Sequence, residues 1–85
     1  MTFHEYLKIY IKKHTLYRNK FIMNIESIEY LHPGDKLEVV RVRYEYMIAH
    51  DTWTQKFTDS IDIGGKKFKM LHRRYMMIHL LEKLN

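Results

Sequence analysis

The 85 residues carry a net charge of +5 and no cysteine, which excludes disulfides, thiolate catalysis and cysteine-type zinc sites. The length allows one domain, and 46% hydrophobic residues with three glycines and one proline are not the composition of a disordered chain. The missing cysteines and the lack of a visible secretory signal lead us to expect a cytoplasmic protein without a membrane anchor.

The first predicted element is a helix that starts near Phe3 and ends between His14 and Asn19. Thr2 and Glu5 have the spacing of a capping box, in which each side chain accepts a hydrogen bond from the other residue's backbone amide. Apolar residues then recur on one helical face, which we expect to enter the core. These residues are Phe3, Tyr6, Leu7, Tyr10 and Ile11.

Three strands are expected next. Residues 20–31 alternate like a strand in their first half and have helical spacing in their second, so a partly helical segment stays open as an alternative. We prefer a strand with an irregularity near Glu26 and Ser27. The segment His32–Asp35 contains Pro-Gly and predicts a type II turn.

The alternation of apolar and polar residues over 37–48 predicts the clearest strand, with its tyrosines in the core and its arginines on the other face. A loop over 49–52 leads into a third strand that alternates from Trp53 to Ile63. Gln55 and Asp59 fall on the apolar face of that strand, which indicates an edge strand or a bulge.

A final helix is expected to follow Gly64 and Gly65. Its first half has one apolar face, formed by Phe68, Leu71, Tyr75 and Ile78. In its second half, apolar residues occupy sides that a single sheet cannot cover, so we predict self-association, with a homodimer as the simplest form. These residues are Met76, Met77, Leu80, Leu81 and Leu84. The predicted fold is one α+β domain over residues 1–85, in the order α-β-β-β-α, with both helices on one face of a three-stranded antiparallel sheet.

Charge is distributed unevenly along the chain. Residues 1–20 hold five basic residues and one acidic residue, residues 64–85 hold six and one, and the segment between them holds four basic and eight acidic residues. Basic helices of this kind favour an anionic partner, and we expect them to contact nucleic-acid phosphates without reading bases. The candidate residues are Lys8, Lys12, Lys13, Lys66, Lys67, Lys69, Arg73 and Arg74. The glycine pair and the free amides at the start of the last helix predict a phosphate cradle.

The element order, with Lys66, Lys67 and Lys69 opening the last helix, resembles the double-stranded-RNA-binding domain. This resemblance is one of topology and implies that the lysines lie against phosphates and that the shape of a duplex is recognised. The glycine-rich lead-in with Lys-Ser and the alanine-rich last helix of that family are absent from this chain.

The alternative function is a small protein-interaction module that binds and modulates a host nucleic-acid enzyme or complex. A phage-like composition rich in Met, Ile, Lys and Tyr fits such a module, and acidic residues of the sheet would suit a basic partner. No catalytic motif is present, so we expect no enzyme and no cofactor. The six histidines lack metal-ligand spacing, so no metal site is expected.

Overall fold

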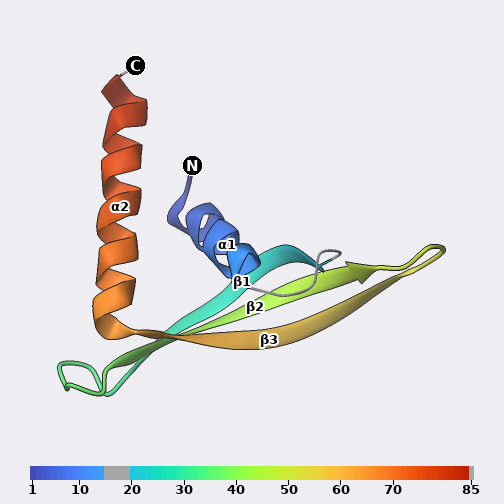
Figure 1. Cartoon of the computed structure of the whole chain (residues 1–85), viewed down its shortest axis with the longest axis horizontal. Helices are drawn as coiled ribbons and strands as arrows, with labels where there is room; N and C mark the ends of the chain where they lie inside the picture. Colours follow the sequence, from blue (N-terminus) through green and yellow to red (C-terminus); the bar gives the residue numbers. More distant parts are fainter. Residues whose placement is uncertain (15–19, 85) are drawn as a thin grey trace.

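The computed structural model describes residues 1–14 and 20–84 and confirms the expected α+β order. The elements are α1 (Phe3–Lys13), β1 (Lys20–Leu31), β2 (Val39–Ala49), β3 (Thr54–Gly64) and α2 (Gly65–Leu84). The strands form an open antiparallel sheet in the order β1-β2-β3 (Figure 1). Both helices contribute to one core on the same face of this sheet.

The predicted capping box starts α1. Thr2 Oγ1 accepts a hydrogen bond from the Glu5 amide at 3.2 Å, and the Thr2 amide donates to Glu5 Oε1 at 3.4 Å. Helix α1 ends at Lys13 with His14 as its C-cap, at the near edge of the expected range; the rest of that range, residues 15–19, lies outside the described residues. Leu7 and Ile11 on the predicted apolar face are fully buried.

Strand β1 is irregular at two places. Its pairing with β2 shifts between Ile25 and Ser27, where an irregularity was expected, and also between Ile22 and Asn24, where none was. Bulges of this kind add an unpaired residue and increase the local twist. Residues 20–31 are therefore a strand throughout, and the helical alternative for their second half is wrong.

The turn after β1 has the predicted geometry. The Asp35 amide donates to the His32 carbonyl at 3.1 Å, and Gly34 has a φ of 80°, as the third position of a type II turn requires. His32 also has a positive φ, of 52°, in the left-handed region that histidine adopts more readily than most residues.

The core lies where α1 and the start of α2 meet the middle of the sheet. Strand β2 is central and supplies three of the buried side chains, because its alternation turns every second residue inward. The buried hydrophobic residues are Leu7, Ile11, Val40, Val42, Tyr44, Ile63, Phe68 and Leu71. Burial of each such side chain is worth about 1.5–3 kcal/mol, so this small cluster carries much of the fold's stability.

The third strand begins one residue later than predicted. Trp53 does not join the apolar face of β3, because it lies in the preceding loop, is 54% exposed and stacks on His50 with ring centroids 3.8 Å apart. The pairing of β2 with β3 runs without a shift from Val39 opposite Gly64 to Ala49 opposite Thr54. Strand β3 is thus an edge strand without a bulge, and its inward polar residues are tolerated there.

Helix α2 rises from one end of the sheet (Figure 1), and its first half supplies its buried side chains. Phe68 and Leu71 are buried and Tyr75 is half-buried, with its ring 5.3 Å from that of Phe3. Ile78 was expected on the same face but is 37% exposed and does not pack against the core cluster. No helix in the described part of the chain is long and apolar enough to cross a membrane.

Candidate nucleic-acid interface

The basic residues of α2 are exposed and, apart from Lys83 in the last turn, lie in two rows. Lys67 and Arg74 are seven residues apart, about two helical turns, and share the side that faces α1. Lys66, Lys69 and Arg73 follow another side, toward the turn after β1 and toward β1 itself. Within residues 1–14 and 20–84 none of these five forms an ion pair, so their charges are available to a partner.

A groove runs between α1 and α2, and we call it the interhelical groove. Its volume is about 230 Å³. Lys13 contributes from α1, and Lys67 and Arg74 contribute from α2, so both helices supply positive charge to one site. The remaining lining residues are Tyr6, Ile9, Tyr10, His14 and Leu71. No carboxylate lines this groove in the part of the chain that the structure describes.

Aromatic rings form part of the groove's wall. The Lys67 ammonium lies 5.9 Å from the centroid of the Tyr10 ring, and the His14 ring lies 4.3 Å from the same ring. Contact with the ring face holds Lys67 toward α1 by a cation–π attraction. Three cations without a counter-charge repel one another, and an anion between them would be bound by charge-assisted hydrogen bonds.

The other basic residues of α1 lie outside the interhelical groove. Lys8 and Lys12 line a separate hollow of about 170 Å³ together with Ile9, Phe21 and Ile22. The Lys12 ammonium lies 5.7 Å from the Phe21 ring centroid. The eight basic residues predicted for a phosphate-binding surface are thus divided among several hollows, and the structure brings together Lys13, Lys67 and Arg74.

Carboxylates stand at the start of α2, where the sequence predicted a phosphate cradle. The Gly65 amide donates to the Glu38 carbonyl at 2.9 Å, and a side chain at Gly65 would meet the Glu38 carboxylate at 2.9 Å. Asp35 lines the same hollow as Lys66 and Lys69. An acidic group near a helix N-terminus interacts favourably with the helix dipole and competes with a bound phosphate. We therefore do not place a phosphate there.

The outer face of the sheet carries charges of both signs. Arg41 Nε and Nη2 donate to the two carboxylate oxygens of Asp62 at 2.8 and 3.1 Å, and this hydrogen bonding lowers the pKa of Asp62. Asp59 lies in register with Tyr44 and therefore shares the inner face with it, away from Arg41 and Asp62. The acidic residues of the middle segment therefore do not form one acidic surface. Tyr44 is buried, as expected from the alternation.

The last two turns of α2 carry the predicted self-association residues, which we call the apolar stripe. Their exposed fractions are 41% for Met76, 66% for Met77, 56% for Leu80, 59% for Leu81 and 81% for Leu84. This part of α2 projects beyond the sheet and α1 (Figure 1). The stripe is therefore mostly exposed, although the Met1 amine lies 3.2 Å from Glu82 Oε2 in the same part of the helix.

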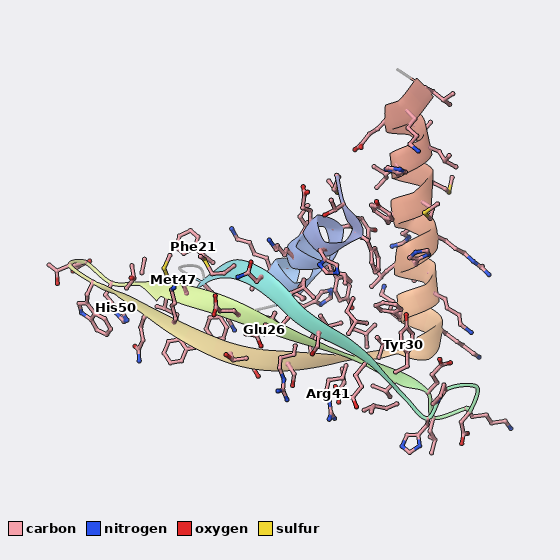
Figure 2. All side chains as sticks on the ribbon, turned by 180° about the vertical axis from the view of Figure 1, so that it is seen from behind. Phe21, Glu26, Tyr30, Arg41, Met47 and His50 are labelled. Carbon is pink, nitrogen blue, oxygen red and sulfur yellow. The ribbon has the colours of Figure 1, made fainter. Side chains whose placement is uncertain are left out.

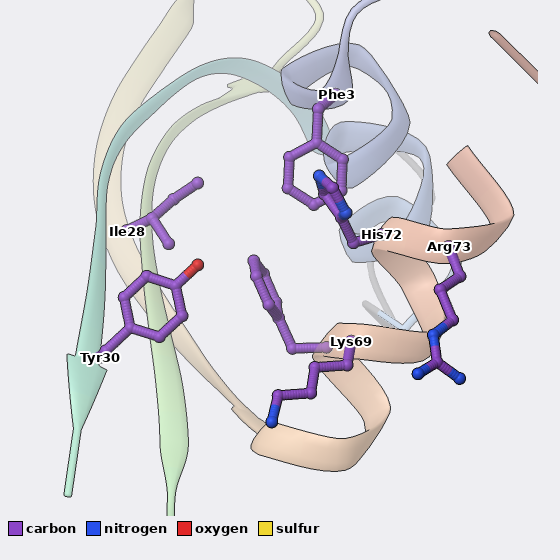
Figure 3. Close-up of a pocket in the computed structure, with 7 residues that line it drawn as sticks. Phe3, Ile28, Tyr30, Lys69, His72 and Arg73 are labelled. Carbon is purple, nitrogen blue, oxygen red and sulfur yellow. The ribbon is translucent and has the colours of Figure 1, made fainter. Parts of the chain in front are cut away.

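The structure also contains a site that the sequence did not suggest. An apolar hollow of about 510 Å³ lies between β1 and α2, on the side of α2 away from the interhelical groove (Figure 3). We call it the aromatic hollow; it is lined by Phe3, Ile28, Tyr30, Phe68, Lys69, His72 and Arg73. These residues come from three distant segments of the chain, so neither spacing nor composition could have indicated them.

Three comparisons bear on identity. The chain matches no family model, no curated protein and no solved structure. The likeness to the double-stranded-RNA-binding domain therefore rests on element order and on the lysines that open α2. Among residues 1–14 and 20–84 there is also no group of three or more histidine and acidic side chains that could hold a metal ion.

Proposed function

We propose that this protein binds the phosphate backbone of nucleic acid, with double-stranded forms favoured, through the interhelical groove and the basic rows of α2. The observation that carries the proposal is the convergence of Lys13, Lys67 and Arg74, from two helices, on one groove whose described lining contains no carboxylate. Contacts to phosphates supply affinity without base identity, so we expect little sequence preference.

The geometry suits phosphates better than an isolated carboxylate. An arginine fork can bind two oxygens of one phosphate, and the two lysines supply point charges at neighbouring positions along a backbone. The projecting α2 carries basic residues on two of its sides, so phosphates on either side of the helix lie within reach. We place this activity in the cytoplasm, which the cysteine-free composition favours.

The test is fluorescence anisotropy of a labelled short duplex titrated with the protein at several salt concentrations. Three phosphate contacts predict that affinity falls about fortyfold between about 50 and 200 mM salt, because bound counterions are released on binding. Lys67→Glu with Arg74→Glu should weaken binding most at low salt and flatten the salt dependence.

A matched control uses the same change in net charge elsewhere. Arg43 on β2 and Lys56 on β3 are both exposed and lie outside the groove and the basic rows of α2. Arg43→Glu with Lys56→Glu should reduce affinity only through the lower net charge and leave the salt dependence nearly unchanged. Equal effects of the two double variants, or no salt-dependent binding by the unaltered protein, would reject the proposal.

A second candidate function is a protein-interaction module that acts on a nucleic-acid enzyme or complex. The observation in its favour is the apolar stripe, whose side chains are 41–81% exposed. Methionine-rich surfaces of this kind adapt to different protein partners. Capture of partners from host lysate, with and without nuclease treatment, separates the candidates: partners lost on nuclease treatment support nucleic-acid binding, and retained partners that Leu80→Glu abolishes support the module.

A further inference from the structure

The aromatic hollow is open to solvent and shaped by rings that meet edge to face. The Phe68 ring lies 5.6 Å from that of Phe3 at 82° and 5.9 Å from that of Tyr30 at 88°. Phe68 itself is 5% exposed, so the ring surface that remains for a further flat group is that of Tyr30. Tyr30 is 54% exposed although it borders this hollow, so much of its ring can be reached by a ligand.

Positive charge borders the hollow on the α2 side only. Lys69 extends beside its mouth, and Arg73 lies one turn further along the helix with its guanidinium turned outward (Figure 3). Ile28 and Tyr30 form the opposite, apolar wall on β1 (Figure 3). No carboxylate lines the hollow in the described part of the chain. The hollow thus combines an aromatic floor with a cationic edge.

Polar groups that could recognise a planar ligand are few. The Tyr30 hydroxyl forms no hydrogen bond with the described residues, and the His72 ring packs against Phe3 with centroids 5.0 Å apart. A hollow of about 510 Å³ falls within the usual size of ligand sites, which are mostly apolar and hold a few well-placed polar groups. A flat, partly polar group that carries an adjacent negative charge matches all of these features.

We propose that the aromatic hollow binds one unpaired base of the nucleic acid, stacked on the exposed ring of Tyr30, with the phosphate next to that base on Lys69. This inference rests on the proposed function, since the nucleic acid has to reach the hollow from the basic rows of α2. Lys69 links the two sites, because it borders the hollow and belongs to the row that Lys66 begins. The preferred ligand is then a duplex that ends in, or is interrupted by, a single-stranded nucleotide.

Two labelled probes test this inference: a blunt duplex, and the same duplex with a short single-stranded overhang that contains 2-aminopurine. Stacking on an aromatic side chain quenches 2-aminopurine fluorescence, and base–aromatic stacking predicts at least about fivefold tighter binding of the overhang probe. Tyr30→Ala should remove both the quenching and the fivefold gain. It should leave binding of the blunt duplex unchanged.

Trp53 offers a matched control, because it is also 54% exposed but lies in the loop at the other end of the sheet. Figure 2 shows this separation, with Tyr30 near the start of α2 and His50, the stacking partner of Trp53, at the far end. Trp53→Ala should not change the binding of either probe. Lys69 is exposed, so Lys69→Gln should not disturb the core. This variant should weaken binding of the overhang probe more than binding of the blunt duplex.

Each other outcome overturns the inference. Equal binding of both probes without quenching would show that the hollow does not bind a base, while the proposal of phosphate binding would stand. Quenching that survives Tyr30→Ala in a variant with an unchanged circular dichroism spectrum would place the base elsewhere. Binding of dodecanoate that depends on Tyr30, without any response of the overhang probe, would assign the hollow to an acyl chain. Absence of binding to both probes would reject phosphate binding and the inference together.

Discussion

The two halves of α2 differ in what surrounds them, although they form one continuous helix. In the first half, Phe68 and Leu71 are 5% and 3% exposed and pack against α1 and the sheet. In the second half, the apolar stripe is mostly exposed and the helix stands clear of the sheet (Figure 1). The same types of side chain therefore serve the core at one end of the helix and face solvent at the other.

This difference shows that an apolar residue in a helix is not evidence of a core contact by itself. The first half follows one face, whereas in the second half the apolar residues spread around the axis. A helix buries a single stripe against a sheet, so the spread itself indicates that a second surface is present. Large exposed apolar patches are typical of interaction sites, so we expect another molecule to cover this one.

The largest expected effect is a difference in stability between variants that are altered in the first and in the second half of α2. Leu71→Ala removes a side chain that is 3% exposed and should lower the free energy of unfolding by about 2–5 kcal/mol, through lost burial and the remaining cavity. Leu81→Ala removes one that is 59% exposed and should change it by less than about 0.5 kcal/mol at low protein concentration. Urea unfolding followed by circular dichroism measures both. Similar losses for the two variants would show that the second half of α2 is part of the core.

The next effect concerns what covers the apolar stripe. We expect two copies to pair through it, so the unaltered protein should have a dimeric mass at tens of micromolar, and Leu80→Glu should return it to a monomer. Sedimentation equilibrium measures the mass. The matched control is Leu37→Glu in the turn after β1, where the leucine is 73% exposed but isolated from the stripe. A monomeric mass for the unaltered protein would show that the apolar stripe does not mediate self-association.

The sequence predicted most of the fold because its strongest signals are local. The capping box at Thr2 and Glu5, the turn at Gly34 and the alternation of β2 depend on neighbours within a few residues. The start of β3 was misplaced because Trp53 has strong strand propensity, while in the structure its ring stacks on His50 in the loop. The burial of Lys20 could not be predicted from neighbouring residues either. Lys20 is 5% exposed, and its ammonium lies 3.8 Å from the centre of the Tyr46 ring.

The candidate site was less predictable than the fold. Sequence identified the basic residues but treated them as one surface, because it could not show on which side of α1 and α2 each residue lies. It also could not show that Glu38, 27 residues before Gly65, would stand beside that glycine at the start of α2. Contacts between distant segments decide both points, and periodicity within one segment carries no information about them.

The smallest expected effect concerns the stability of the buried core. It is absent near neutral pH and appears only in alkaline solution. Burial, with a smaller contribution from the Asp59 charge, raises the pKa of Tyr44 above its ordinary value. A tyrosine whose pKa is raised by folding stabilises the folded state fully below its unfolded pKa of about 10, and that contribution is lost as the pH rises through the folded pKa. Unfolding should therefore become easier between about pH 10 and the folded pKa, because the unfolded chain loses its proton first.

Tyr44→Phe isolates this contribution from those of the other tyrosines. The variant should lose less stability than the unaltered protein when urea midpoints at about pH 8 and about pH 11 are compared, since phenylalanine has no proton to release. Tyr30→Phe is the matched control, because Tyr30 is 54% exposed whereas Tyr44 is 3% exposed. It should follow the pH dependence of the unaltered protein. If both variants respond alike, burial in the core is not what sets the alkaline response, and the contrast between covered and exposed regions does not extend to their ionisable groups.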